Sequence, residues 1–166
     1  KNNEGLSPLD YWESLWKDYQ VTENIELYKA TNKGPAYESA DVSDNTYIDG
    51  LLTDKVIKDL KRLKISGKPF LLTAGFIAPH LPFNAPTKYW DMYDRKNIKQ
   101  PNNNYVPINA PKTSISNWGE MRAYTDIPKQ GGVSDEKAIS LIHGYYATVS
   151  YVDALIGLIM TALADL

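Results

Sequence analysis

One of the two histidines of the sequence, His80, lies in the segment GFIAPHLPF, whose prolines would hold it rigidly. Pro79 and Pro82 fix their own φ angles and restrict the residue before each of them, so little entropy remains to be lost when the imidazole binds something. A neutral imidazole donates one hydrogen bond and a charged one donates two, which suits an anionic oxygen. From these residues alone His80 is either such a ligand or a turn residue without a role.

Other ionisable residues carry weaker signals. Asp41, Asp44 and Asp49 lack the alternating spacing of an EF-hand loop, and we interpret them as turn-forming acids of a surface loop. His143 lies in a helical pattern and is expected to be solvated or satisfied in the core, whereas Asp153 is expected to be a hydrogen-bonded structural carboxylate. The chain has no cysteine, which excludes disulfides, thiolate metal sites and cysteine nucleophiles.

The elements expected next to His80 are a strand and the helix before it. Residues 69–76 form an apolar run bounded by proline and glycine, which predicts a central strand covered on both faces. His80 would then follow the carboxyl end of that strand, where open α/β sheets place ligands. Thr53 is the expected N-cap of the preceding helix and Gly67 its terminator. A helix leading into such a strand is half of a βαβ unit and predicts an α/β sheet.

The rest of the chain is expected to be two helices separated by irregular segments. Residues 7–19 have an aromatic helical face, and residues 21–50 are predicted to be mostly loop with one short strand at 25–28. Ser134 is the expected N-cap of the clearest helix, which would be on the order of 45 Å long at ~1.5 Å per residue unless it breaks near Gly157.

Residues 84–133 are predicted to be a long loop, interrupted by a short helical turn at 87–93. Trp90, Tyr105 and Trp118 lie in this loop and are candidate substrate-binding residues, because aromatic rings can line a sugar-binding cleft. The alternative is that these three rings anchor the loop.

Composition limits the size of the domain and the classes of partner. With 166 residues, 43% of them hydrophobic, the chain suffices for one modest domain with a core. Its 18 basic and 20 acidic residues give a net charge of −2, which offers no electrostatic reason to expect nucleic acid or an anionic membrane as partner. There is no uninterrupted apolar run of about 18 residues, so we expect no span of a bilayer.

Three segments together resemble the middle of a type I sulfatase, of the iduronate-2-sulfatase-like branch of the alkaline-phosphatase superfamily. They are, in order, KGPAYESADVSDNTYIDGLLTDKVIKDLKRL, GKPFLLTAGFIAPHLPFNAPTKYWDMY and YYATVSYVDALIGLIMTALADL. The resemblance implies a partial alkaline-phosphatase-like α/β sandwich, with residues 1–166 as the central part of one sulfatase catalytic domain. It also implies an exported location, which would be periplasmic, extracellular or lysosomal.

The resemblance further implies hydrolysis of a sulfuric ester, here of a sulfated carbohydrate, by a formylglycine nucleophile beside a calcium ion. His80 matches the histidine that reaches the sulfate in such enzymes. The motif that is converted to formylglycine does not occur in this chain, and the resemblance places it upstream, with part of the metal site downstream. Iduronate-type members commonly have Lys two residues before this histidine, whereas this chain has Ala78, so a uronate 2-sulfate is not implied.

Two other functions stay open from the sequence. One is a phosphonate or phosphodiester hydrolase of the same superfamily, and the other is a non-catalytic carbohydrate-binding or interaction module. The nucleophile motif and an assay of sulfate against phosphate esters would separate these possibilities.

Overall fold

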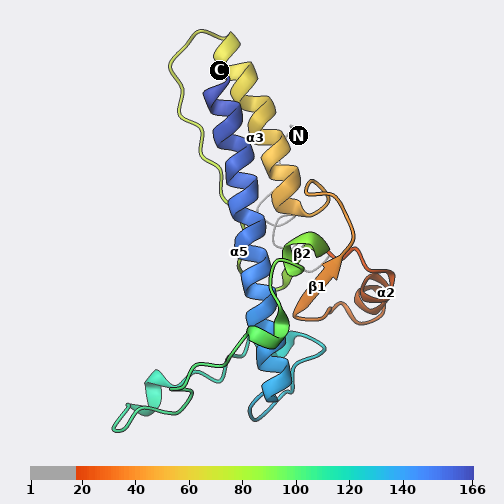
Figure 1. Cartoon of the computed structure of the whole chain (residues 1–166), viewed down its shortest axis with the longest axis vertical. Coiled ribbons are helices and arrows are strands. Elements are labelled where there is room, and N and C mark those ends of the chain that lie inside the picture. Colours follow the sequence, from red (N-terminus) through yellow and green to blue (C-terminus); the bar gives the residue numbers. More distant parts are fainter. Residues whose placement is uncertain (1–17) are drawn as a thin grey trace.

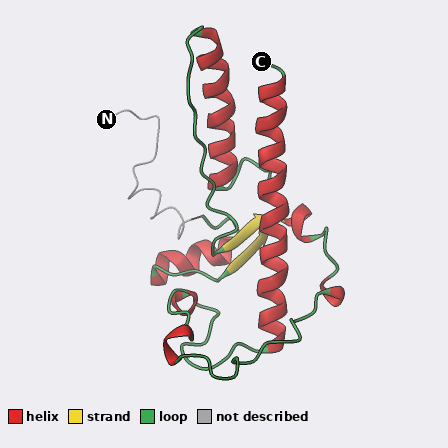
Figure 2. Cartoon of the chain, turned by 90° about the vertical axis from the view of Figure 1, so that its left-hand side faces the viewer, coloured by secondary structure: helices red, strands yellow, loops and turns green. Residues whose placement is uncertain are grey.

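The computed structural model describes residues 18–166. In them, one long helix packs against most of the other elements. Helix α5 (Asp135–Ala164) runs the length of the molecule, and helix α3 (Ile48–Ile65) lies beside its C-terminal half (Figure 1). Two short strands and helix α4 (Thr87–Trp90) pack against the other half of α5, and both strands lie on one side of it (Figure 2).

The two strands, β1 (Tyr37–Ala40) and β2 (Phe83–Pro86), form a parallel sheet. Tyr37 pairs with Phe83 and Ala40 with Pro86, while α3 provides the crossover between the strands. The arrangement is a βαβ unit, and the expected α/β class is confirmed at this level. The described residues contain this small sheet alone, which is consistent with part of a sulfatase domain.

The core forms where α5 meets the sheet and α4. Gly144 allows this close approach, because a Cβ there would lie 2.9 Å from the Cβ of Phe83 and 2.9 Å from the ring of Trp90. The main cluster of buried residues comprises Ala40, Tyr47, Ala85, Tyr89, Trp90, Ala147, Tyr151 and Leu155. Burial of these aromatic and aliphatic side chains is the main stabilising contribution of the region.

Helix α5 matches its prediction closely. The Ser134 side chain caps it by accepting a hydrogen bond from the Lys137 N–H at 3.2 Å, and the helix continues through Gly157 without a break. By length and composition α5 could also cross a membrane, a test that the core helix of a water-soluble domain passes equally. One face of α5 packs against α3, α4 and β2, and 22% of its apolar window is buried.

The strand predicted at residues 69–76 is absent, so that prediction was wrong for this chain. These residues run back along the outside of the helix pair in irregular conformation (Figure 1), with Leu71 90% exposed. Within residues 18–166 no strand pairs with them, and an apolar run without a pairing edge cannot form a sheet strand. The strand that pairs with β1 lies further along the chain, after His80.

Predictions for residues 21–50 were also wrong in part. Residues 25–28 belong to helix α2 (Thr22–Thr31), not to a strand. None of the residues of α2 is buried, so its sequence needs no apolar face, and without such a face the pattern does not indicate a helix. Helix α3 begins at Ile48 rather than after Thr53, whose hydroxyl instead donates to the carbonyl of Asp49, one turn earlier, at 2.9 Å. The helix predicted at 7–19 lies outside the described residues, apart from its last two positions.

The long loop is largely as predicted. After β2 and α4 the chain has only three-residue helical turns, at Arg95–Asn97, Lys112–Ser114 and Met121–Ala123, before α5 begins. Part of the loop extends away from the rest of the molecule (Figure 1). The prediction that Gly67 terminates the helix before it is confirmed, because α3 ends at Ile65 and is followed by Ser66 and Gly67. Gly67 has φ +66°, a left-handed conformation that glycine adopts at low cost.

Candidate functional site

His80 lies in a tight turn between α3 and β2. The turn spans residues 77–80 and is closed by the His80 N–H, which donates to the Ile77 carbonyl at 2.9 Å. The peptide bonds before Pro79 and Pro82 are both cis. Directly after the turn, the Phe83 N–H donates to the carbonyl of Ala36 at 2.9 Å, so the turn leads straight into the parallel pairing.

Both ring nitrogens of His80 face hydrogen-bond acceptors. Nδ1 lies 2.7 Å from the carbonyl oxygen of Leu81, and Nε2 lies 3.2 Å from the Oε1 of Glu120. A carbonyl and a carboxylate only accept, so both contacts are satisfied when each nitrogen carries a proton. The arrangement therefore suits an imidazolium whose Nε2–H points at an anionic oxygen, and its half-exposed side chain is accessible from solvent.

The turn is held from the side of α3 by a carboxylate. Asp49, in the first turn of α3, accepts the N–H of Ile77 at 2.9 Å and that of Ala78 at 2.8 Å. Asp49 is only 3% exposed, and this burial raises the pKa of its carboxyl, while the two backbone N–H groups act in the opposite direction. The expectation that Asp49 is a surface-loop acid was wrong, because α3 starts early enough to bring it inside.

A small cavity of about 20 Å³ lies beneath the turn, and a second acid, Asp18, lines it together with Asp49 and His80. Burial raises the pKa of Asp18 to about 7, opposed by the Ile48 N–H and reinforced by the charges of Asp49 and Glu38. The volume suffices for about one water molecule. Asp18 and Asp49 thus line the cavity on the inner side of the His80 turn.

The three aromatic candidates occupy different environments. Trp90 is 8% exposed, and its ring packs on Tyr37 and His143 at centroid distances of 5.8 and 4.9 Å. That burial favours the anchoring alternative for Trp90, whose ring is not free to stack on a sugar here. Tyr105 and Trp118 are 69% and 66% exposed among residues 18–166, and their role in substrate binding stays a prediction.

His143 is satisfied in the core, one of the two roles expected for it. Its Nε2 lies 2.8 Å from the carbonyl of Trp90, to which it donates. Asp153 is exposed, and within residues 18–166 no group hydrogen-bonds to its carboxylate, so the interpretation as a bonded structural acid was wrong. Its position on the outer side of α5 faces solvent.

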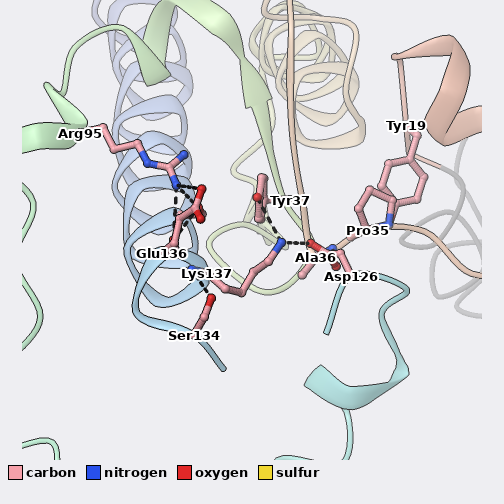
Figure 3. Close-up of polar contacts among 10 residues, drawn as sticks. Tyr19, Pro35, Ala36, Tyr37, Arg95, Asp126, Ser134, Glu136 and Lys137 are labelled. Atoms are coloured by element: carbon pink, nitrogen blue, oxygen red, sulfur yellow. Dashed lines mark hydrogen bonds and ion pairs between the residues drawn. The ribbon is translucent and has the colours of Figure 1, made fainter. Parts of the chain in front are cut away.

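A separate set of charged residues joins the long loop to α5 (Figure 3). The Lys137 ammonium contacts the Asp126 carboxylate at 2.9 Å and the Tyr37 hydroxyl at 3.2 Å. The other carboxylate oxygen of Asp126 accepts the Ala36 N–H at 2.7 Å, directly before β1. Arg95 donates to the Ser140 hydroxyl on α5. Because these cations are already paired, we interpret the set as structural.

The described residues do not bring together a calcium site. Within residues 18–166 no group of three or more His, Cys, Asp or Glu side chains is arranged to hold a metal ion. The calcium ion that the resemblance implies would thus need ligands from outside these residues.

Sequence reasoning found His80 but missed its two acidic neighbours. Asp49 is 28 and 29 residues from the two N–H groups that it binds, and Glu120 is 40 residues from His80, so neither contact leaves a local pattern. The one available signal was the pair Asp49–Gly50 ahead of an apolar helical stripe, which is compatible with an earlier helix start.

Known proteins similar to this chain are sulfatases. A sequence model of the Sulfatase family matches residues 9–166. Iduronate 2-sulfatase of Mus musculus is 30% identical over 133 residues, which are 76% of this chain and 24% of that protein. The Homo sapiens iduronate 2-sulfatase is 30% identical over 132 residues, with the same two shares.

An arylsulfatase of Clostridium perfringens is 30% identical over 108 residues, 64% of this chain and 21% of that protein. The chain thus spans about a quarter of the length of the curated relatives it matches. The match to the family covers the turn, both strands and all of α5. This chain belongs to the sulfatase family.

Proposed function

We propose that this chain supplies one wall of the active site of a sulfuric-ester hydrolase, with His80 as a contact of the sulfate group. The observation that carries the proposal is a half-exposed imidazole in a hydrogen-bonded turn, whose Nε2 already pairs with an anionic oxygen, that of Glu120. Preorganised donors around a group that develops negative charge supply much of the stabilisation in such reactions.

The proposed substrate is a sulfated carbohydrate. Two of the similar proteins are named iduronate 2-sulfatase, which supports an acidic sugar ester as the general class. Ala78 cannot pair with a sugar carboxylate, so the proposal stops at sulfated carbohydrates and does not specify the sugar. A formylglycine nucleophile, a calcium ion and an exported location belong to the proposal through family membership alone.

The chain's own part in the reaction is to bind and orient. In its doubly protonated form His80 donates from Nδ1 to Leu81 and from Nε2 to a sulfate oxygen or the leaving oxygen. Glu120 now occupies the Nε2 side, so a bound anion must replace its carboxylate there. A negative charge at that position opposes anion binding through space.

The experiment is a His80→Ala substitution in the intact protein, assayed with p-nitrophenyl sulfate and p-nitrophenyl phosphate. We expect kcat/KM for the sulfate ester to fall by about 100-fold, as for loss of one oxyanion donor. His143→Gln is the matched control, because Gln keeps a donor for the Trp90 carbonyl and should leave turnover unchanged. Unchanged sulfate turnover in His80→Ala would contradict the proposal, and preferential phosphate turnover would favour the phosphoesterase alternative.

A second variant tests the occupied side of the ring. Glu120→Gln removes the negative charge 3.2 Å from Nε2 while keeping the size of the side chain. We expect KM for the anionic ester to fall several-fold, with a smaller effect at high salt, where exposed charges are screened. An increase in KM would show instead that Glu120 helps to bind the substrate.

A further inference from the structure

We infer that Asp49 is the positioning residue of the candidate site, the group that fixes the His80 turn for the reaction. The inference rests on the proposed role of His80 and extends it to a residue that touches no substrate. Asp49 binds two consecutive N–H groups of the turn, of Ile77 and Ala78, through different carboxylate oxygens. Such charge-assisted bonds are about twice as strong as neutral ones.

The carboxylate itself stands on a rigid support. Asp49 belongs to the first turn of the 18-residue helix α3, which packs along α5. The neighbouring Gly50 is pressed against the loop before the helix, since a Cβ there would lie 1.8 Å from the Asp44 carbonyl oxygen. The start of α3 therefore has little freedom to shift, and the position of Asp49 follows from the helix.

From Asp49 the constraint reaches the imidazole through three short links. The Ile77 N–H is bound by Asp49, the Ile77 carbonyl is bound by the His80 N–H at 2.9 Å, and the His80 ring is bound by Leu81. On the far side the turn is held by the Phe83 N–H bond to Ala36. Without Asp49 the backbone of the turn would keep this second anchor, at the end that leads into β2, and the ring would keep its contact with Glu120.

A second buried carboxylate provides an internal control. Glu38 on β1 also accepts two consecutive N–H groups, those of Gln20 at 2.7 Å and Val21 at 3.0 Å. It is as buried as Asp49, at 2% exposed, and it also accepts the Asn24 amide and the Tyr47 hydroxyl, each at 2.8 Å. Within residues 18–166 none of its hydrogen bonds goes to the turn. Glu38→Gln and Asp49→Asn thus remove the same chemistry from two places, only one of which carries His80.

The first measurement is kcat/KM for p-nitrophenyl sulfate in the intact protein. Asp49→Asn keeps the size of the side chain but turns one acceptor into a donor that faces an N–H group. We expect a loss on the order of 10- to 100-fold, mostly in kcat, since a misplacement of about 1 Å has such consequences. Glu38→Gln should lower the unfolding temperature while kcat/KM of the folded protein is retained.

The second measurement separates positioning from general damage. In a His80→Ala background, Asp49→Asn should cost little more, because two residues that act through one contact are not additive. Hydrogen exchange of a peptide covering residues 76–82 should become faster in Asp49→Asn and stay unchanged in Glu38→Gln. Where Asp49→Asn does not fold, Asp49→Glu serves instead, since it keeps the charge and displaces the oxygens by one methylene.

The outcomes are distinct. Fast exchange of the turn with a non-additive loss of turnover supports the inference. An additive loss, or an unchanged turnover in Asp49→Asn when His80→Ala is impaired, overturns it while leaving the proposed function intact. If His80→Ala itself has no effect, the proposed contact and the positioning role that depends on it are both overturned.

Discussion

Two strongly apolar segments of the chain have opposite surroundings. In α5, Tyr151 and Leu155 are buried against the sheet and the neighbouring helices. In residues 69–76, which are just as apolar, Phe70 and Leu71 are exposed. Apolar content therefore predicts a tendency to be buried, but burial itself requires a partner surface. Among residues 18–166 helix α5 has such a surface along one face, whereas in residues 69–76 it is Phe76, at the end of the segment, that packs against the main core cluster.

Glycines of the chain have two kinds of surroundings, crowded and open. Gly50 and Gly144 lie where two parts of the backbone or core come close together, whereas Gly75 and Gly157 have nothing within 4 Å of an added Cβ. The first pair belongs to the packed region and the second to the exposed parts of the chain. The change in stability on replacing each of these glycines with alanine therefore tests where the packed region ends.

The largest effect is expected at Gly50. An alanine there would place Cβ 1.8 Å from a backbone oxygen, which forces the start of α3 away from residues 44–45. We expect Gly50→Ala to lower the free energy of unfolding by more than about 4 kcal/mol, measured by urea denaturation. Gly75→Ala in the exposed segment is the matched control and should change it by less than about 0.5 kcal/mol. Equal effects would mean that the exposed segment is packed.

A leucine pair tests the same contrast with side chains. Leu155 is 1% exposed on α5, so Leu155→Ala leaves a cavity and should destabilise the chain by about 3 kcal/mol. Leu71→Ala removes a side chain that already lies in water and should be within about 0.5 kcal/mol of the parent. A cost above about 2 kcal/mol at Leu71 would show that residues 69–76 are covered in solution, and would favour the strand predicted for them.

Two aspartates extend the comparison to pH. Burial raises the pKa of Asp18 to about 7, whereas Lys55 and Arg62 lower the pKa of Asp59 on the exposed side of α3. The folded state thus holds the Asp18 proton more tightly than the unfolded state does. Stability from this group is present below pH 4 and lost as pH rises to about 7.

We expect Asp18→Asn to remove part of this fall in stability between pH 5 and 7, by at most about 3 kcal/mol. Burial also raises the pKa of Asp49, which acts on the stability in the same direction. Asp59→Asn is the control, because the lowered pKa of Asp59 affects stability only as pH falls below the ordinary range of a carboxyl. Urea denaturation at several pH values measures both, and identical pH profiles of Asp18→Asn and the parent would contradict the assignment.

The same contrast explains what the sequence could and could not predict. Helix α5 was predictable because its N-cap residue and its apolar periodicity both indicate the helix that the structure contains. The rigidity of the His80 turn was predictable from Pro79 and Pro82. Helix α2 buries nothing and the strands are four residues long, so neither has a period to detect. The clamp by Asp49 depends on two segments 28 residues apart, a tertiary relation that no local pattern encodes.

The smallest changes in the free energy of unfolding are expected for two glycines of α5, and they have opposite signs. Gly144→Ala would push Cβ to 2.9 Å from Phe83 and Trp90, and we expect this overpacking to cost about 1–2 kcal/mol even after the helix propensity of alanine is counted. Gly157→Ala adds the same methyl group in open space further along the same helix and should stabilise the chain by about 0.5–1 kcal/mol. Thermal unfolding of both variants measures the difference. If Gly157→Ala were also destabilising, the face of α5 that carries Gly157 would be covered in solution, in contrast to the open space found there.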